Sequence, residues 1–199
     1  FELSKYFPTL EKEVKSFGLN VEITEKEKTV DSDIKSAFLK GNTREHMLLF
    51  YPNSPLLGIS SNELIKIKFE VDINPPKYAN FEPQFKLLPA PYEVNLYDAP
   101  SLFAGKLHAV ICRSWKNRIK GRDLYDYVFY LSKGTKFNLP HLKERLVQTE
   151  AIAPEKNLTI DDVKNMLIKK FDAIDYDQAK KDVIPFIKDT KSIDIWSAN

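Results

Sequence analysis

Length, composition and charge limit the classes of protein to which this sequence can belong. The chain has 199 residues, of which 43% are hydrophobic and 29% charged, as is ordinary for a globular protein. The formal net charge is only +2, so any nucleic-acid surface must be a local patch. The single cysteine, Cys112, excludes an internal disulfide and a cysteine-based zinc cluster, and we expect a cytoplasmic protein. No apolar run approaches the roughly 18 residues that span a bilayer, so we expect no membrane partner.

The first half of the chain predicts a mixed α/β region. Apolar side chains recur there at helical spacing in some segments and alternate with polar side chains in others. In chain order, the predicted elements are a helix over 8–18, a strand over 20–26, a helix over 32–42, and strands over 46–51, 64–73 and 91–98.

The second half predicts helices that follow one another with short breaks. They run from Asp98 to about Arg113, from Asp123 to Ser132, and onward from the cap-like residues Asn138, Thr159 and Asp175 or Asp177. The last helix should bend or end near Pro185. We therefore expect an α+β protein with a mixed sheet in domain 1–98 and a helical bundle in domain 99–199.

One face of the strand over 64–73 carries charged side chains. Lys68, Glu70 and Asp72 lie two residues apart, so they project from the same side of a sheet. Glu70 and Asp72 could hold Mg²⁺, which proteins bind through one or two carboxylates and substrate phosphates. An exposed sheet face with alternating charges is the commoner explanation.

Lys106 lies within or beside the apolar stripe of its predicted helix. The lysine either extends its ammonium group to solvent or points into a cleft. A compact cation in a cleft would suit a nucleotide phosphate.

The helix over 123–132 is apolar nearly all round and should therefore be buried. Its narrow polar sector holds Asp123 and Asp126, which need partners because an unpaired buried charge is costly. The partners are either Lys106, Arg113 or Arg122 in structural ion pairs, or a nucleotide site that these aspartates form with Lys106. The pattern leaves both interpretations open.

A basic run precedes these aspartates and contains Trp115. It could contact RNA or a triphosphate, although a solvated loop between helices is the commoner explanation. Its members are Arg113, Lys116, Arg118, Lys120 and Arg122.

The segments "LFAGKLHAVICR" and "KGRDLYDYVFYL" together resemble the signature of the AbiEii/AbiGii toxin family. These are bacterial nucleotidyltransferase-like proteins of toxin–antitoxin and phage-defence (abortive infection) systems. The family pattern is a helix reading K-L-x-A, an arginine-rich loop, and then R-D-x-Y-D-L. The segments "AFLKGNTREHMLLFY" and "IKIKFEVDINPP" are also similar to its middle section, so the resemblance covers roughly residues 30–150.

The resemblance implies a polymerase-β-like fold, of which residues 1–98 would be a mixed-sheet remnant. It implies transfer of a nucleotide from an NTP, such as GTP, to RNA, such as tRNA, with Mg²⁺ and with an antitoxin encoded nearby. Lys106, Asp123 and Asp126 then become candidate catalytic residues, and Glu70 with Asp72 the weaker metal candidates. The basic run becomes the candidate contact for nucleotide or RNA.

The sequence departs from the family pattern at its start. A G-G/S-x-x-L turn and a D-x-D strand normally come first, and neither is found before residue 30. The tripeptide "DSD" at 31–33 is better explained as a helix cap. We therefore expect an N-terminally truncated chain that is inactive or very weak alone. The rival interpretation is a non-catalytic RNA- or protein-binding module that uses segment 113–122.

Overall fold

The chain forms two compact units, Phe1–Pro75 and Pro76–Asn199. A computed structural model describes residues 2–26, 32–53, 56, 58–114 and 119–197. The division lies before the boundary expected after residue 98, because residues 76–98 bond to the helices that follow. Asn80 N, for example, donates to Ser101 Oγ at 2.9 Å. That either boundary separates independently folding domains stays a prediction.

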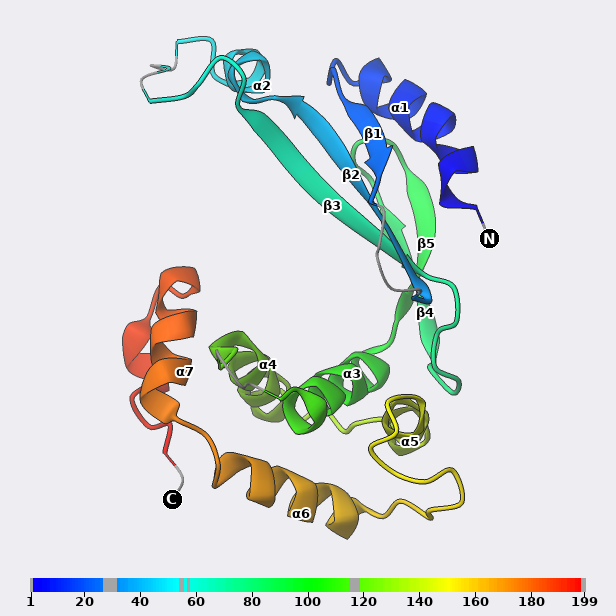
Figure 1. Cartoon of the computed structure of the whole chain (residues 1–199), viewed down its shortest axis with the longest axis vertical. Coiled ribbons are helices and arrows are strands. Elements are labelled where there is room, and N and C mark those ends of the chain that lie inside the picture. Colours follow the sequence, from blue (N-terminus) through cyan, green and yellow to red (C-terminus); the bar gives the residue numbers. More distant parts are fainter. Residues whose placement is uncertain (1, 27–31, 54–55, 57, 115–118, 198–199) are drawn as a thin grey trace. The chain divides into compact units, whose positions relative to one another are not determined.

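The first unit is built on an antiparallel sheet with strand order β1-β2-β3 (Figure 1). The strands are β1 (Glu22–Glu25), β2 (Ile34–Asn42) and β3 (Leu64–Asp72). A short 3₁₀ turn, η1 (Leu3–Tyr6), leads into α1 (Phe7–Ser16), and α2 (Thr43–Phe50) follows β2. Leu3, Ile23 and Ala37 are buried where η1 and α1 pack on the sheet.

Two predicted elements in this unit are wrong. Residues 34–42 form a strand and not a helix, because β2 is the central strand and is covered on parts of both faces, which removes the polar–apolar alternation. Residues 43–50 form a helix and not a buried strand. A short apolar run does not reveal its own period, whereas Asn42 and Glu45 carried the helix signal: the Asn42 side chain accepts from Glu45 N at 3.1 Å.

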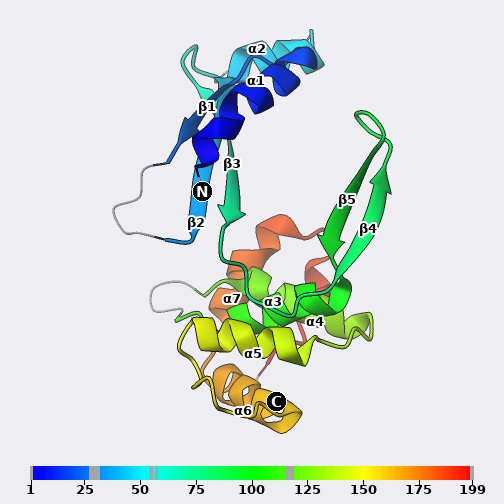
Figure 2. The same cartoon turned by 90° about the vertical axis from the view of Figure 1, so that its right-hand side faces the viewer.

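The second unit joins a β-hairpin to a set of helices. The hairpin, β4 (Phe81–Lys86) with β5 (Tyr92–Tyr97), extends away from the helices (Figure 2), and β4 was not predicted. The helices, in chain order, are α3 (Ala99–Cys112), α4 (Gly121–Ser132), α5 (Leu139–Gln148), α6 (Ile160–Phe171) and α7 (Tyr176–Val183), followed by the turns η2 (Ile184–Phe186) and η3 (Thr190–Ile193).

Four predicted helix starts in this unit are confirmed, whereas the helix expected from Asp123 begins at Gly121. The side chains of Asp98, Asn138, Thr159 and Asp175 each accept a hydrogen bond from the backbone N–H three residues on. Such caps satisfy backbone donors that the first helical turn leaves unpaired. The molecule is thus a mixed α/β protein with small antiparallel sheets. Across the described residues, no helix has the length and apolar composition of a membrane span.

The core of the second unit lies between α3, α4, α5 and α6. Phe103, Leu107, Leu142 and Leu146 are almost fully buried. The expectation that α4 is buried all round is wrong for this unit, since one side of α4 is exposed. Tyr125, Val128 and Phe129 on that side are 38%, 41% and 48% exposed.

Candidate functional site

The candidate site lies where α3 and α4 face each other. Lys106 and Arg113 lie seven residues apart, in α3 and at its C-terminal cap, while Asp123 and Asp126 lie three apart near the start of α4. The connection between the two helices is short, so they run in opposite directions. Arg113 at the end of α3 therefore meets Asp123 in the first turn of α4, and Lys106, further back in α3, meets Asp126, further on in α4.

Two ion pairs follow from this arrangement. Lys106 Nζ donates to Asp126 Oδ2 at 2.6 Å. Arg113 Nη1 donates to both carboxylate oxygens of Asp123, each at 2.6 Å. The sequence left open which cation pairs with which aspartate, and the geometry pairs Lys106 with Asp126 and Arg113 with Asp123.

Burial separates the two pairs. The Asp123 side chain is 9% exposed, whereas those of Lys106 and Asp126 are 41% and 36% exposed. Asp123 also lies in the first turn of α4, where the helix dipole favours a negative charge. Arg113 is 46% exposed, so Asp123 is the one buried member of the two pairs, whereas both side chains of the Lys106–Asp126 pair reach solvent.

Both pairs border one cavity of about 450 Å³. Its polar lining consists of Lys106, Arg113, Lys120, Arg122, Asp123, Tyr125 and Asp126, and its apolar side of Val183, Phe186 and Ile187. Four basic side chains against two carboxylates leave an excess of two positive charges among the described lining residues. The volume lies in the range of small-molecule sites.

The apolar wall comes from the C-terminal part of the chain. Gly121 lets α7 approach the start of α4, because an ideal Cβ at this position would lie 1.9 Å from Ala179 O. Ile119 N also donates to Gln178 Oε1 at 2.9 Å. As a result Phe186 reaches the cavity, where the Arg122 guanidinium lies 4.6 Å from its ring centroid (cation–π).

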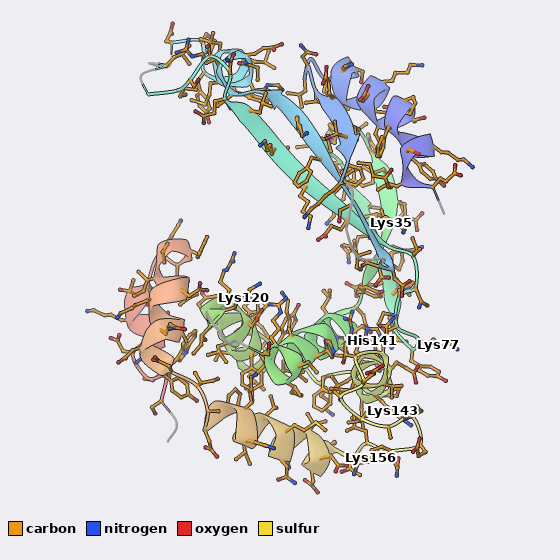
Figure 3. All side chains as sticks on the ribbon, in the orientation of Figure 1. Lys35, Lys77, Lys120, His141, Lys143 and Lys156 are labelled. Atoms are coloured by element: carbon orange, nitrogen blue, oxygen red, sulfur yellow. The ribbon has the colours of Figure 1, made fainter. Side chains whose placement is uncertain are left out.

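Sequence reasoning missed Tyr125, Val183, Phe186 and Ile187. The only available signals were the glycine in "KGRD" and the apolar run "IPFI", and neither indicates which helix packs against which. Lys120, which directly precedes Gly121, is labelled in Figure 3. Lys116, Arg118 and Trp115, the other members of the predicted basic run, lie outside the described residues.

Glu70 and Asp72 lie in the first unit, on β3. Glu70 Oε1 accepts from Ser36 Oγ at 3.0 Å and from Lys68 Nζ at 2.6 Å, and Asp72 Oδ1 accepts from Asn74 N at 3.0 Å. Within the described part of the chain, no group of three or more His, Cys, Asp or Glu side chains is arranged to hold a metal ion. A metal role for Glu70 and Asp72 stays a prediction.

The comparison with known families decides the classification. A family profile described as "Nucleotidyl transferase AbiEii toxin, Type IV TA system" matches residues 1–198. The chain belongs to this family. Membership extends beyond the 30–150 region that carried the resemblance, and it identifies a nucleotidyltransferase of a toxin–antitoxin system, for which an NTP substrate and an antitoxin partner are implied. Among curated proteins, none matches the chain significantly.

Proposed function

We propose that the cavity between α3, α4 and the end of α7 binds the triphosphate of an NTP, such as GTP, and that the protein transfers a nucleotide to RNA, such as tRNA. The supporting observation is that six residues selected for this role from the sequence line one cavity: Lys106, Arg113, Lys120, Arg122, Asp123 and Asp126. The setting we propose is the bacterial cytoplasm and phage defence, with an antitoxin encoded nearby.

Lys106 is the residue we propose to meet the triphosphate. Its ammonium group is partly exposed and is bonded to a carboxylate that is also partly exposed. A polyphosphate carries more negative charge than Asp126 and would compete for this ammonium group. Arg122, held over the Phe186 ring, and Lys120 supply further positive charge at the same cavity.

In the transfer step one P–O bond forms and another breaks. The terminal hydroxyl oxygen of the RNA attacks the α-phosphorus, and the bond from that phosphorus to the pyrophosphate oxygen breaks. The hydroxyl proton needs a base. Asp126 fits this role once Lys106 has moved to the phosphates, because its carboxylate is then free to accept a proton. Asp123, which is buried and held at both oxygens by Arg113, positions that arginine.

Each of the two carboxylates at this cavity is bonded to a cation, and the described residues hold no group of three or more His, Cys, Asp or Glu side chains placed to bind a metal ion. Members of nucleotidyltransferase families generally use a divalent metal that neutralises charge on the phosphates. We therefore propose that these 199 residues are inactive or very weak alone. Glu70 and Asp72 remain the candidate metal ligands, and a polymerase-β-like remnant followed by a helical bundle remains the proposed fold.

Binding of fluorescent GTP, followed by anisotropy, tests the nucleotide site without requiring turnover. We expect Lys106→Ala to weaken binding roughly 10- to 100-fold, the effect of losing a charge-assisted hydrogen bond. Lys143→Ala, at a lysine on α5, is the matched control and should bind as the unmodified protein does. Equal GTP binding by both variants would contradict the proposal.

RNA binding under varied salt tests the rival function. A non-catalytic module that uses segment 113–122 would bind RNA with a steep salt dependence and would be indifferent to Lys106→Ala. That outcome, together with an absence of GTP binding, would favour the module. Transfer of radioactive GTP to RNA by excess protein in Mg²⁺, lost in Lys106→Ala and Asp126→Asn, would instead support the enzyme.

A further inference from the structure

A second cavity lies along a different side of α3. It has a volume of about 760 Å³ and is bordered by α3, α5, Ala151 and Met166 of α6. Its polar lining residues are His108, Cys112, Arg113, Arg145 and Thr149, so no carboxylate is among the described residues that line it. Arg113 alone among the described residues borders both this cavity and the candidate nucleotide cavity.

The guanidinium of Arg145 is held at this cavity from two sides. Its Nε donates to His141 Nε2 at 3.0 Å, and His141 Nδ1 in turn donates to Lys77 O at 2.8 Å. On the α3 side, an ideal Cβ at Gly105 would lie 3.5 Å from Arg145 Cζ. The guanidinium therefore lies within van der Waals reach of α3 at Gly105.

His108 and Thr149 form the hydrogen-bonded part of the lining. His108 Nε2 lies 3.0 Å from Thr149 Oγ1, which donates its proton to Arg145 O at 3.0 Å. Leu146 O is a second carbonyl acceptor for this proton, at 3.4 Å, and with the proton on either carbonyl the hydroxyl accepts from His108 Nε2–H. A neutral ring then keeps a lone pair on Nδ1, and protonation would turn Nδ1 into a further donor.

The surroundings of His108 keep its ring neutral. Burial, and then the charges of Arg145 and Arg113, lower the pKa of His108 from 6.5 to about 4. Cys112 contributes no negative charge, because burial raises the pKa of its thiol. From α6, the Lys170 ammonium donates to Arg113 O. An anion placed here would meet the guanidinium groups of Arg145 and of Arg113, the second of which also bonds Asp123 through Nη1, and would favour protonation of His108.

We propose that this cavity binds a phosphate group through Arg113, Arg145 and His108. The site is distinct from the nucleotide cavity and does not depend on the proposed function. Guanidinium groups suit phosphate oxygens, and a protonated imidazole would add a third charged donor. The group could come from free phosphate or from the phosphodiester backbone of a polynucleotide.

Side-chain NMR of the histidines in the ¹⁵N-labelled full chain tests this directly. The pH is titrated in chloride and in inorganic phosphate at equal ionic strength, and His108→Gln assigns the His108 signal. Phosphate should raise the pKa of His108 by about one unit, because bound anion and bound proton stabilise each other. The pKa of His141 should change less. Unchanged His108 titration in phosphate would overturn the proposal.

Phosphate affinity, measured by calorimetry, supplies the second readout. It should rise about threefold as the pH falls from 6 to 4.5, a range in which free phosphate stays a monoanion, because only then does His108 gain its proton in the complex. His108→Gln should abolish that rise, and Thr149→Val should reduce it. Lys143→Ala should leave it unchanged. Affinity lost in Lys106→Ala but kept in His108→Gln would place the phosphate in the nucleotide cavity and contradict the inference.

A single-stranded RNA without terminal phosphates separates the two sources. If it raises the pKa of His108 at concentrations below those of inorganic phosphate, the ligand is the polynucleotide backbone. If only inorganic phosphate acts, the ligand is a free phosphate. Both results support a phosphate site. If neither the RNA nor inorganic phosphate raises the pKa of His108, the proposal is contradicted.

Discussion

The two compact units differ most in their cores. Counting described residues only, sixteen buried apolar residues form one cluster in the second unit, from Phe103 to Trp196, whereas the cluster of the first unit has three, Leu3, Ile23 and Ala37. Burial of apolar surface is the main favourable term in folding, so the second unit should be much the more stable by itself.

The two units also differ in the apolar side chains that they expose. In the first unit, large apolar side chains such as Phe50 and Ile67 are 63% and 57% exposed, and both border an apolar cavity of about 310 Å³. In the second unit, α3 and α4 carry the candidate site on a well-packed scaffold. Catalytic groups need fixed geometry, so the better-packed unit is where a site of this kind is expected.

Hydrogen exchange should show the largest effect of this difference. Amides of β1–β3 should exchange roughly a thousandfold faster than those of α3 and α5, which corresponds to about 4 kcal/mol in opening free energy. Mass spectrometry of peptic fragments measures both sets in one sample. Equal protection of the two units would contradict the claim that the second unit is the more stable.

Gly121→Ala should destabilise the second unit by about 3 kcal/mol, because the new Cβ would clash with the backbone oxygen of Ala179. Chemical denaturation measures this loss. The exchange rates of β1–β3 serve as the internal control and should stay unchanged. A stability equal to that of the unmodified protein would show that α7 does not pack on α4 as described.

Acidification should weaken the second unit in a defined pH window. Burial and nearby arginines lower the pKa of His108 to about 4, and burial also lowers the pKa of His141, so the unfolded chain binds more protons than the folded one. Stability is then full above the ordinary histidine pKa of 6.5 and falls as the pH drops towards 4. Asp162, whose pKa the Thr159 hydrogen bond lowers to about 2, matters only below its ordinary value of 3.8.

Thermal unfolding at a series of pH values measures this loss, and His108→Gln should reduce the slope between pH 6.5 and 4. A melting temperature that rises on acidification across this window would contradict the assigned direction of both histidine pKa values.

Gly105→Ala should change stability least, and it should raise stability where Gly121→Ala lowers it. Its Cβ would make an ordinary contact with Arg145 and would favour the helix, so stability should rise by about 0.5–1 kcal/mol. Gly18→Ala is the matched glycine of the first unit and should destabilise, because Gly18 has φ +79°. A loss of stability in Gly105→Ala would mean that Arg145 cannot accept the extra methyl group.

The sequence predicted the elements of the second unit better than those of the first. In the second unit, caps such as Asp98 and Thr159 fix helix starts through local hydrogen bonds that sequence reveals. In the first unit, β2 was mistaken for a helix, because its strand character depends on pairing with Leu64–Asp72 far along the chain. Nonlocal pairing can override the local preference of residues such as Ala37 and Leu39.

The same limit applies to the candidate site. Lys106, Asp123 and Asp126 could be selected from the sequence, because charges in apolar helices need partners. Their pairing could not, since it depends on how α3 and α4 run past each other. The contribution of Phe186 depends on the approach of α7 at Gly121, which no local pattern encodes.

Acylation of lysines, read by mass spectrometry with and without GTP, tests the nucleotide site most directly. The account predicts that GTP slows acylation of Lys106, whose side chain is 41% exposed, while Lys143 is unaffected and guanosine, which has no phosphates, protects neither. Protection of Lys143 but not Lys106, or equal protection by guanosine, would contradict a triphosphate site at this cavity.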